Sequence, residues 1–170
     1  GLAQHRVTGC EFDVAVVTNI THEHLDFHGS YAGYRAAKAR LFELTAESMQ
    51  KEFGPRKLAV LNHDDESWEY LHDSLRIPFV SYGTSGDAQI RAEEVRQSAD
   101  GLHLHIAGAG VEQQVRCGLL GSYNTSNILA AYSATVAGLG IAPGTAARGI
   151  ADLAGIPGRM EKIERGQNFI

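Results

Sequence analysis

Five residues between positions 22 and 28 carry side chains that can bind a metal ion: His22, Glu23, His24, Asp26 and His28. By spacing alone, the three histidines could ligate zinc, since imidazole is a common zinc ligand. One histidine with carboxylates could instead hold a harder ion such as Mg²⁺ or Mn²⁺. A polar loop that binds no ion is the third interpretation, and the spacing does not decide among them.

A lysine lies on the apolar side of the helix predicted after this cluster. At about 100° per residue, Lys38 falls between Tyr34 and Phe42, on an arc that also holds Ala37 and Leu41. Such a lysine can extend its amine to solvent. Alternatively it is kept for chemistry, because burial favours a neutral amine. A neutral amine can add CO₂ to form a carbamate, which is a good ligand for a hard ion.

Three residues nearer the C-terminus could contact a nucleotide. Asn124 and Asn127 lie one turn apart on a predicted helix, where they could bond a purine edge or ribose, or could cap the helix. Arg159 could contact phosphate, or could be a solvated charge at the start of a strand. The sequence contains neither a Walker A motif nor a G-x-S-x-G nucleophile motif.

The elements that must position these residues follow a β–α–β order. Buried strands are predicted at 12–20, 57–61 and 78–82, a meander of short alternating strands at 89–117, and helices at 124–138 and 145–153. We expect Ser30 to cap the Lys38 helix, and Asp64 or Asp65 to cap the next one. The fold class is therefore α/β, a mostly parallel sheet flanked by helices with a small antiparallel meander. Ligands of such sheets bind at the carboxyl ends of the strands.

Composition narrows the class of protein. The chain has 170 residues, enough for one domain, and its net charge of −5 argues against a nucleic-acid partner. Cys10 and Cys117 belong to no motif, which favours a reducing, cytoplasmic setting. No apolar run reaches membrane-spanning length, so we expect no membrane insertion. The start without Met and the strand-like end predict a piece of a longer protein.

Taken in order, the motifs resemble the central domain of the Mur ligases, the ATP-dependent amide-forming enzymes of peptidoglycan synthesis. Residues 18–29, TNITHEHLDFHG, are similar to the family segment T-N-L/I-S/T-x-D/E-H-L-D-Y/F-H-G. Its ending is most like the ligase that adds the third residue of the peptide. The segments 36–42, 62–65, 121–127 and 158–161 look like A-A-K-x-x-L-F, N-x-D-D, G-x-x-N-x-x-N and G-R-M-E.

The resemblance implies a metal site and a modified lysine. Lys38 would be the catalytic residue and would be carbamoylated in the intact enzyme, and its carbamate and His24 would hold Mg²⁺. His22 lies where relatives often carry Arg, and we assign it no role.

The resemblance also implies the ligands. Gln4 and Arg6 would contact UDP-MurNAc-dipeptide, Asn124 and Asn127 would lie near the adenine of ATP, and Arg159 would lie near ATP. The family reaction makes an acyl phosphate from the substrate carboxylate and ATP, which the amine of a diamino acid then attacks.

The family's phosphate-binding loop and its C-terminal domain have no counterpart in residues 1–170. We therefore expect a central-domain fragment that is inactive alone, with an exposed sheet edge through which it could self-associate. Two alternatives stay open: a related ligase of the folylpolyglutamate or cyanophycin synthetase type, and a non-catalytic ligand-binding module. The segments 4–6 and 25–29 argue against the related ligases.

Overall fold

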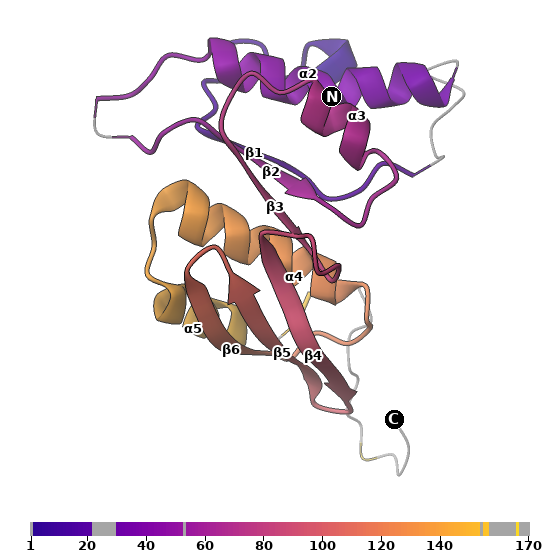
Figure 1. Cartoon of the computed structure of the whole chain (residues 1–170), viewed down its shortest axis with the longest axis vertical. Coiled ribbons are helices and arrows are strands. Elements are labelled where there is room, and N and C mark those ends of the chain that lie inside the picture. Colours follow the sequence, from indigo (N-terminus) through magenta and orange to yellow (C-terminus); the bar gives the residue numbers. More distant parts are fainter. Residues whose placement is uncertain (1, 22–29, 53, 154, 157–165, 167–170) are drawn as a thin grey trace.

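The computed structural model describes residues 2–21, 30–52, 54–153, 155–156 and 166. Figure 1 shows its helices and strands along the chain. Their bounds are η1 Leu2–Gln4, β1 Val14–Val17, α2 Tyr31–Glu47, β2 Leu58–Asn62, α3 Trp68–Asp73, β3 Phe79–Gly83, β4 Ile90–Ser98, β5 Gly101–Gly108, β6 Val111–Cys117, α4 Asn124–Ser133, η2 Ala134–Gly138 and α5 Pro143–Ala151.

The six strands form one sheet in the order β1-β2-β3-β4-β5-β6. Strands β1 to β4 pair in parallel, whereas β4, β5 and β6 pair antiparallel. The parallel and antiparallel parts meet at a narrow junction, because β3 and β4 pair only at Tyr82 with Ile90 and at Gly83 with Arg91. This sheet confirms the expected fold class.

Helices cover both faces of the parallel part (Figure 1). Helices α2 and α3 contact β1 and β2 on one face, and α4 contacts β2, β3 and β4 on the other. Strand β2 lies between β1 and β3 and is covered on both faces, which explains why residues 58–61 are all apolar. Ala59 and Leu61 join the core under α2 and α3, Val60 joins the core under α4, and all three are fully buried.

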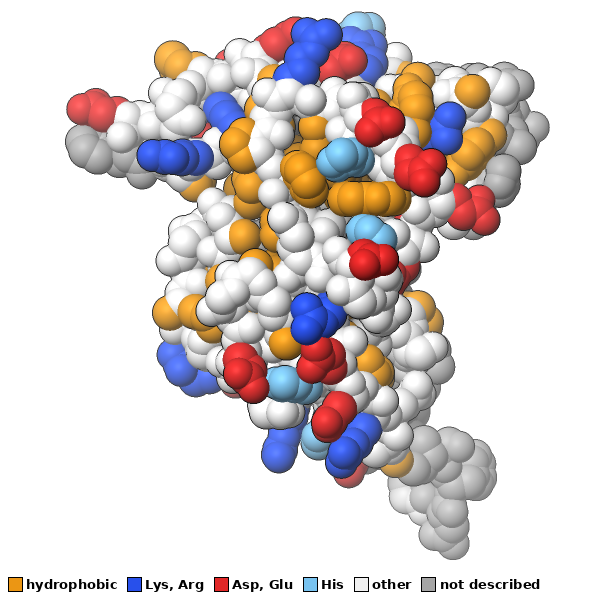
Figure 2. All heavy atoms as spheres, viewed as in Figure 1, with side chains coloured by type: hydrophobic (Ala, Val, Ile, Leu, Met, Phe, Trp, Pro, Cys, Tyr) orange, Lys and Arg blue, Asp and Glu red, His pale blue; other side chains and the backbone are white. Residues whose placement is uncertain are grey.

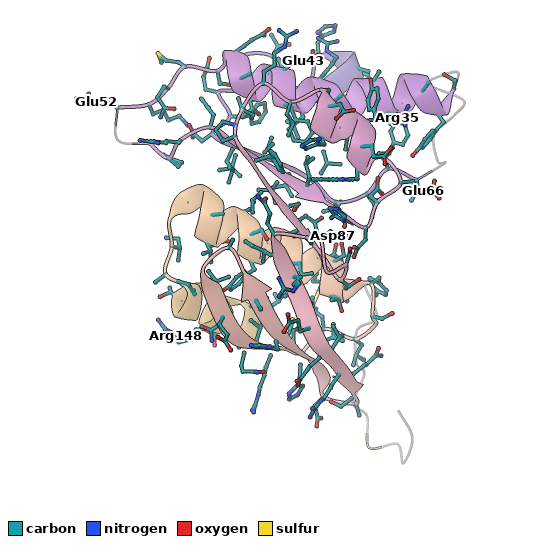
Figure 3. The ribbon with its side chains drawn as sticks, in the orientation of Figure 1. Arg35, Glu43, Glu52, Glu66, Asp87 and Arg148 are labelled. Atoms are coloured by element: carbon teal, nitrogen blue, oxygen red, sulfur yellow. The ribbon has the colours of Figure 1, made fainter. Side chains whose placement is uncertain are left out.

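Helix α2 begins where its sequence predicts. The Ser30 hydroxyl accepts a hydrogen bond from the Gly33 amide at 3.1 Å, which satisfies one of the unpaired N–H groups of the first turn. Farther along, Arg35 stacks its guanidinium carbon 4.0 Å from the ring centroid of Tyr70, beside α3 (Figure 3). This cation–π contact joins α2 to the helix beside it.

The predicted cap of the next helix is wrong. Helix α3 begins at Trp68, and its cap position, Ser67, makes no side-chain capping bond. Asp64 instead accepts bonds from Thr84 and Ser85 in the β3–β4 loop, and Asp65 accepts one from Ile20 beyond β1. Bonds to other elements therefore take the Asp64 carboxylate and one oxygen of Asp65, whose other oxygen accepts from the Ser67 amide just before α3.

The helix expected at 124–138 changes its hydrogen-bonding pattern near its end. Helix α4 is followed by one π-helical segment, Ala134–Gly138, which contacts β1. Gly138 lies so close to Val14 that a Cβ there would come within 2.8 Å of a valine methyl. Among the described residues, no helix is long and apolar enough to cross a membrane.

Candidate functional site

The carboxyl ends of β1, β2 and β3 meet the first turn of α4 through side chains. Asn62, the last residue of β2, donates from Nδ2 to the Thr18 carbonyl at 2.8 Å and to Ser126 Oγ at 3.4 Å. Tyr82 of β3 brings its hydroxyl to 3.5 Å from the same Thr18 carbonyl. This edge of the sheet is where an α/β protein binds its ligand.

Tyr82 occupies the interior of that edge. Its side chain is fully buried, and its hydroxyl is also 3.4 Å from the Val17 carbonyl. Burial raises the pKa of Tyr82 to about 12, against a smaller opposing effect of its bond to Ser126. The phenol therefore stays protonated at neutral pH and can act as a hydrogen-bond donor to the end of β1.

Lys38 is half-buried on α2, as its place on the apolar arc predicted. Its Nζ lies 5.3 Å from the centroid of the Tyr34 ring, and Phe42 on the next turn is 2% exposed. An ammonium group over an aromatic face is favoured electrostatically. In this arrangement the amine lies near the ring of a residue one turn earlier on the same helix.

Several predicted site residues lie outside the described part of the chain. These are His22, His24, His28 and Arg159. Among the residues that are described, no cluster of three or more His, Cys, Asp or Glu side chains could hold a metal ion. Lys38 is therefore the one described member of the predicted Mg²⁺ site.

Gln4 and Arg6 lie at the N-terminal end of the described chain, in η1 and the turn that follows it. Both side chains are exposed, and η1 contacts α2. The segment predicted to bind the nucleotide sugar therefore packs on the helix that carries Lys38. No hydrogen bond or ion pair joins either side chain to Lys38 within the described residues.

Asn124 and Asn127 are brought together on the first turn of α4. Asn127 Nδ2 donates to Asn124 Oδ1 at 3.0 Å, and Asn124 Nδ2 donates back to the Leu120 carbonyl at 2.7 Å. Neither residue caps α4, whose cap position is Tyr123. Asn124 is 8% exposed and Asn127 is exposed, so Asn127 is the more accessible of the two to solvent.

The hydrogen-bonding roles of Asn62, Asp64 and Asp65 were not predicted from the sequence. The N-x-D-D match pointed to these positions but assigned them no contacts. A usable signal was present, because two acids directly after a buried strand lie at the ligand-binding edge of the sheet.

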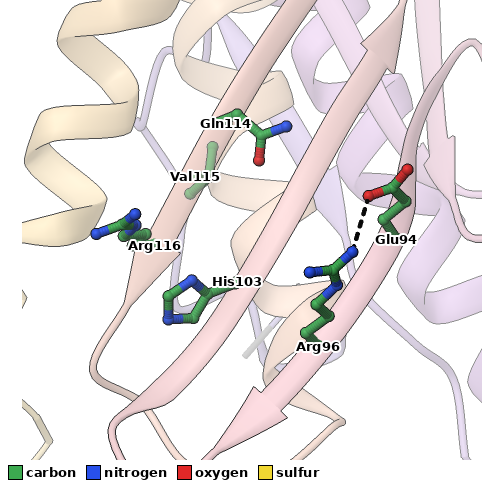
Figure 4. A pocket seen from close by; sticks show the side chains of 6 residues that line it. All are labelled: Glu94, Arg96, His103, Gln114, Val115 and Arg116. Atoms are coloured by element: carbon green, nitrogen blue, oxygen red, sulfur yellow. Dashed lines mark hydrogen bonds and ion pairs between the residues drawn. The ribbon is translucent and has the colours of Figure 1, made fainter.

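A separate hollow of about 370 Å³ lies on the antiparallel part of the sheet (Figure 4). It is lined by Glu94, Arg96, His103, Gln114, Val115 and Arg116. Arg96 pairs with Glu94 at 3.5 Å, and both side chains are largely exposed. Figure 2 shows charges of both signs interspersed over this part of the surface. None of the predicted site residues that the structure describes lines this hollow.

The Mur ligase middle domain family matches residues 1–135. The UDP-N-acetylmuramoyl-L-alanyl-D-glutamate--2,6-diaminopimelate ligase of Geobacillus kaustophilus is 40% identical over 99% of this chain and 34% of its own length. The same-named ligase of Geobacter sulfurreducens is 42% identical over 97% of this chain and 32% of its own length. The chain therefore spans about a third of the length of these curated relatives.

Solved structures show the same architecture. A structure of UDP-N-acetylmuramoyl-L-alanyl-D-glutamate--2,6-diaminopimelate ligase superposes with a TM-score of 0.80 at 29% identity, over 96% of this chain and 33% of that one. MurF from Thermotoga maritima in complex with ADP gives a TM-score of 0.69 at 18% identity, over 92% of this chain and 34% of that one, which indicates a shared fold. With the family matched over residues 1–135, this chain belongs to the Mur ligase middle-domain family.

Proposed function

We propose that residues 1–170 are the middle domain of an ATP-dependent ligase that adds the third amino acid to UDP-MurNAc-L-Ala-D-Glu during peptidoglycan-precursor synthesis. The observation that carries this proposal is identity of about two residues in five, along nearly the whole chain, to ligases named for that reaction. Two neighbours of the folylpolyglutamate synthetase kind share the fold at only 14% and 15% identity. They therefore give no comparable support to the alternative of a related ligase.

The reaction has two steps. An oxygen of the substrate carboxylate attacks the γ-phosphorus of ATP, so that ADP leaves and an acyl phosphate forms. The amine of a diamino acid, such as diaminopimelate or lysine, then attacks the acyl carbon, the C–N bond forms, and phosphate leaves as the nitrogen loses a proton. Both steps bring anions together, so positioning and charge neutralisation supply most of the catalysis.

In this proposal, four described residues and Arg159 bind and orient the reactants. Asn124 and Asn127 hold the adenine of ATP at the first turn of α4, and Arg159, which lies outside the described residues, contacts ATP. Gln4 and Arg6 hold UDP-MurNAc-dipeptide on the side of α2. The exposed amide of Asn127 and the exposed side chains of Gln4 and Arg6 support these roles.

Mg²⁺, bound by His24 and a carbamate on Lys38, would neutralise charge between the two anionic reactants. The match of residues 36–42 to the family segment A-A-K-x-x-L-F and the half-buried place of Lys38 support this role. A cytoplasmic location completes the proposal, and the two free cysteines, Cys10 and Cys117, are consistent with it.

Substitution of Lys38 in the complete protein tests the proposal. Phosphate release from ATP is measured with UDP-MurNAc-dipeptide and either diaminopimelate or lysine. We expect Lys38→Ala to abolish release and Lys38→Arg not to restore it, because a guanidinium cannot form a carbamate ligand. Arg40→Ala, an exposed change on the same helix, is the matched control and should retain activity. A wild-type rate for Lys38→Arg would rule out the carbamate, and no release by the wild type would rule out the ligase.

A further inference from the structure

We infer that Asn62 and Asp65 are positioning residues for this ligase, because they tie the end of β1 to the first turn of α4 and to the residue before α3, and Tyr31 continues the connection to α2. The inference rests on the proposed function, since α2 and α4 carry proposed site residues. Neither residue is proposed to touch a substrate. Their effect would pass through the backbone and side chains that they hold.

Asn62 fixes the end of β1 against the helix proposed to bind the nucleotide. Its Nδ2 donates to the Thr18 carbonyl at 2.8 Å and to Ser126 Oγ at 3.4 Å, and its Oδ1 accepts from the Asp64 amide at 3.0 Å. One amide group therefore connects β1, α4 and the turn after β2. Ser126 lies between Asn124 and Asn127 on the first turn of α4.

Asp65 fixes the next residues of the same segment against α3. Its Oδ2 accepts from the Ile20 amide at 3.1 Å, and its Oδ1 accepts from the Ser67 amide at 2.9 Å. Ile20 is 4% exposed and Ser67 is fully buried, so water cannot readily replace either bond. Both oxygens must accept, and an amide, which offers one oxygen, cannot make both bonds.

Tyr31 extends the connection to the helix that carries Lys38. Its hydroxyl lies 3.3 Å from the Ile20 carbonyl and 2.8 Å from Ser67 Oγ. Ile20 is therefore held at its amide by Asp65 and at its carbonyl by Tyr31. Tyr31 is the first residue of α2, about two turns before Lys38.

Asp64, the residue before Asp65, connects different parts of the chain. Asp64 accepts from the amides of Thr84 at 2.6 Å and Ser85 at 3.1 Å, and so holds the β3–β4 loop rather than the end of β1. Two neighbouring carboxylates thus fix two different loops. This difference makes the inference specific to Asp65 and separable from a general effect of removing charge near β2.

The main experiment measures kinetics and hydrogen exchange on the complete protein. We expect Asp65→Asn to lower kcat on the order of 10- to 100-fold, because a small displacement of the segment after β1 misaligns the reacting groups. The KM for ATP should change by less than about threefold, since the contacts of α4 are kept. Hydrogen exchange should accelerate in peptides that contain Ile20 and Ser67. Asn62→Ala should alter both kcat and the KM for ATP, because Asn62 also holds α4.

Matched variants separate positioning from loss of structure. Asp73→Asn makes the same chemical change at a residue of α3 whose side chain is 80% exposed, and it should leave kinetics and exchange unaltered. Asp64→Asn should accelerate exchange at Thr84 and Ser85 instead. If Asp65→Asn fails to fold, Tyr31→Phe is the milder test, with Tyr70→Phe as its control. Tyr31→Phe should lower kcat several-fold while retaining the ring.

The outcomes distinguish this inference from the proposed function. Wild-type exchange at Ile20 in Asp65→Asn would overturn the connection, whatever the activity. Faster exchange with an unaltered kcat would overturn the positioning role while leaving the connection in place. A wild-type protein without ligase activity would overturn the proposed function, and with it the positioning role. The exchange data would then stand as a test of the hydrogen bonds alone.

Discussion

At the scale of single residues, Tyr82 shows how burial sets a chemical property. Its phenol is enclosed among the ends of β1 and β2 and the first turn of α4, and its hydrogen bonds to backbone carbonyls are long. Removing the phenolate form from water is costly, so burial raises the pKa of Tyr82 to about 12 from its ordinary value of 10.0. Stability should therefore depend on pH through this residue at alkaline pH.

The sign of that dependence follows from proton binding. Between pH 10 and 12 the unfolded chain releases the Tyr82 proton before the folded chain does, so the free energy of unfolding falls as pH rises. A shift of about two pKa units corresponds to at most about 2.7 kcal/mol. We expect Tyr82→Phe to show a shallower alkaline loss in urea unfolding from pH 8 to 11.5. Tyr123→Phe, at a 55% exposed tyrosine, should match the wild type, and equal slopes for all three proteins would contradict the assignment.

Single residues also show what the sequence can and cannot predict about the site. The place of Lys38 beside Tyr34 and Phe42 was predictable, because helical periodicity alone decides it. The contacts of Asp65 were not, because its partner Ile20 is 45 positions away and becomes a neighbour only when β1 pairs with β2. The approach of His24 to Lys38 and the role of Arg159 stay predictions, since both His24 and Arg159 lie outside the described residues.

At the scale of elements, the π-helical segment after α4 brings the backbone of Gly138 directly against the Val14 side chain of β1. Gly138 lies against Val14, and a Cβ at Gly138 would come within 2.8 and 3.0 Å of the two valine methyls. Valine is β-branched and cannot easily rotate away. The close packing of this segment on the first strand therefore depends on glycine.

Adding one methyl group at Gly138 tests this contact. We expect Gly138→Ala to lower the free energy of unfolding by roughly 1–3 kcal/mol through overpacking. Gly149→Ala, a glycine of α5 whose added Cβ meets nothing within 4 Å, should instead raise it by about 0.5–1 kcal/mol. Denaturant unfolding measures both changes. Val14→Ala combined with Gly138→Ala should recover part of the loss, and strict additivity of the two substitutions would exclude the contact.

Helix caps were predicted correctly from the sequence where the capping side chain bonds only within its own turn. Ser30 caps α2, since its hydroxyl accepts from the amide of Gly33, three residues along the same turn. Asp64 and Asp65 satisfied the same local rule, yet Asp64 binds amides of the β3–β4 loop, and Asp65 binds the amides of Ile20 and of Ser67. The cap position of α3 is Ser67, so the capping prediction was wrong. The strand predicted at 12–20 is confined to Val14–Val17, and the rest of that span instead supplies Thr18 and Ile20 to side chains of β2 and the turn after it.

At the scale of the whole molecule, the sheet presents β1 at one end of the strand order, and within the described residues β1 pairs only with β2. Self-association through that edge stays a prediction. So does the assignment of residues 1–170 as the central-domain part of a larger enzyme. The alternation of strands and helices predicted the fold class, since sequence order alone distinguishes a parallel region from a meander.

We expect the 170-residue chain by itself to be catalytically inert. In this proposal the Gly-rich loop that holds the ATP phosphates and the domain that selects the amino acid come from the rest of the ligase. Losing orientation alone can forfeit roughly 7–11 kcal/mol of barrier lowering. The measurement is phosphate release with ATP, UDP-MurNAc-dipeptide and a diamino acid, with the Lys38→Ala chain as the blank. Turnover well above that blank would show that the chain alone is sufficient.

The narrow β3–β4 junction has a consequence for how the chain folds. Strands β4, β5 and β6 are joined by tight turns, so their pairing closes only short loops, whereas β1, β2 and β3 can pair only across intervening helices. Only two residue pairs link the two parts along the sheet. We therefore expect the antiparallel strands to pair before the parallel strands have formed. We expect pulse-labelled amides of β5 to gain protection before those of β2. Helix α4, which follows β6 in the sequence, would then join the two parts by packing across β2, β3 and β4.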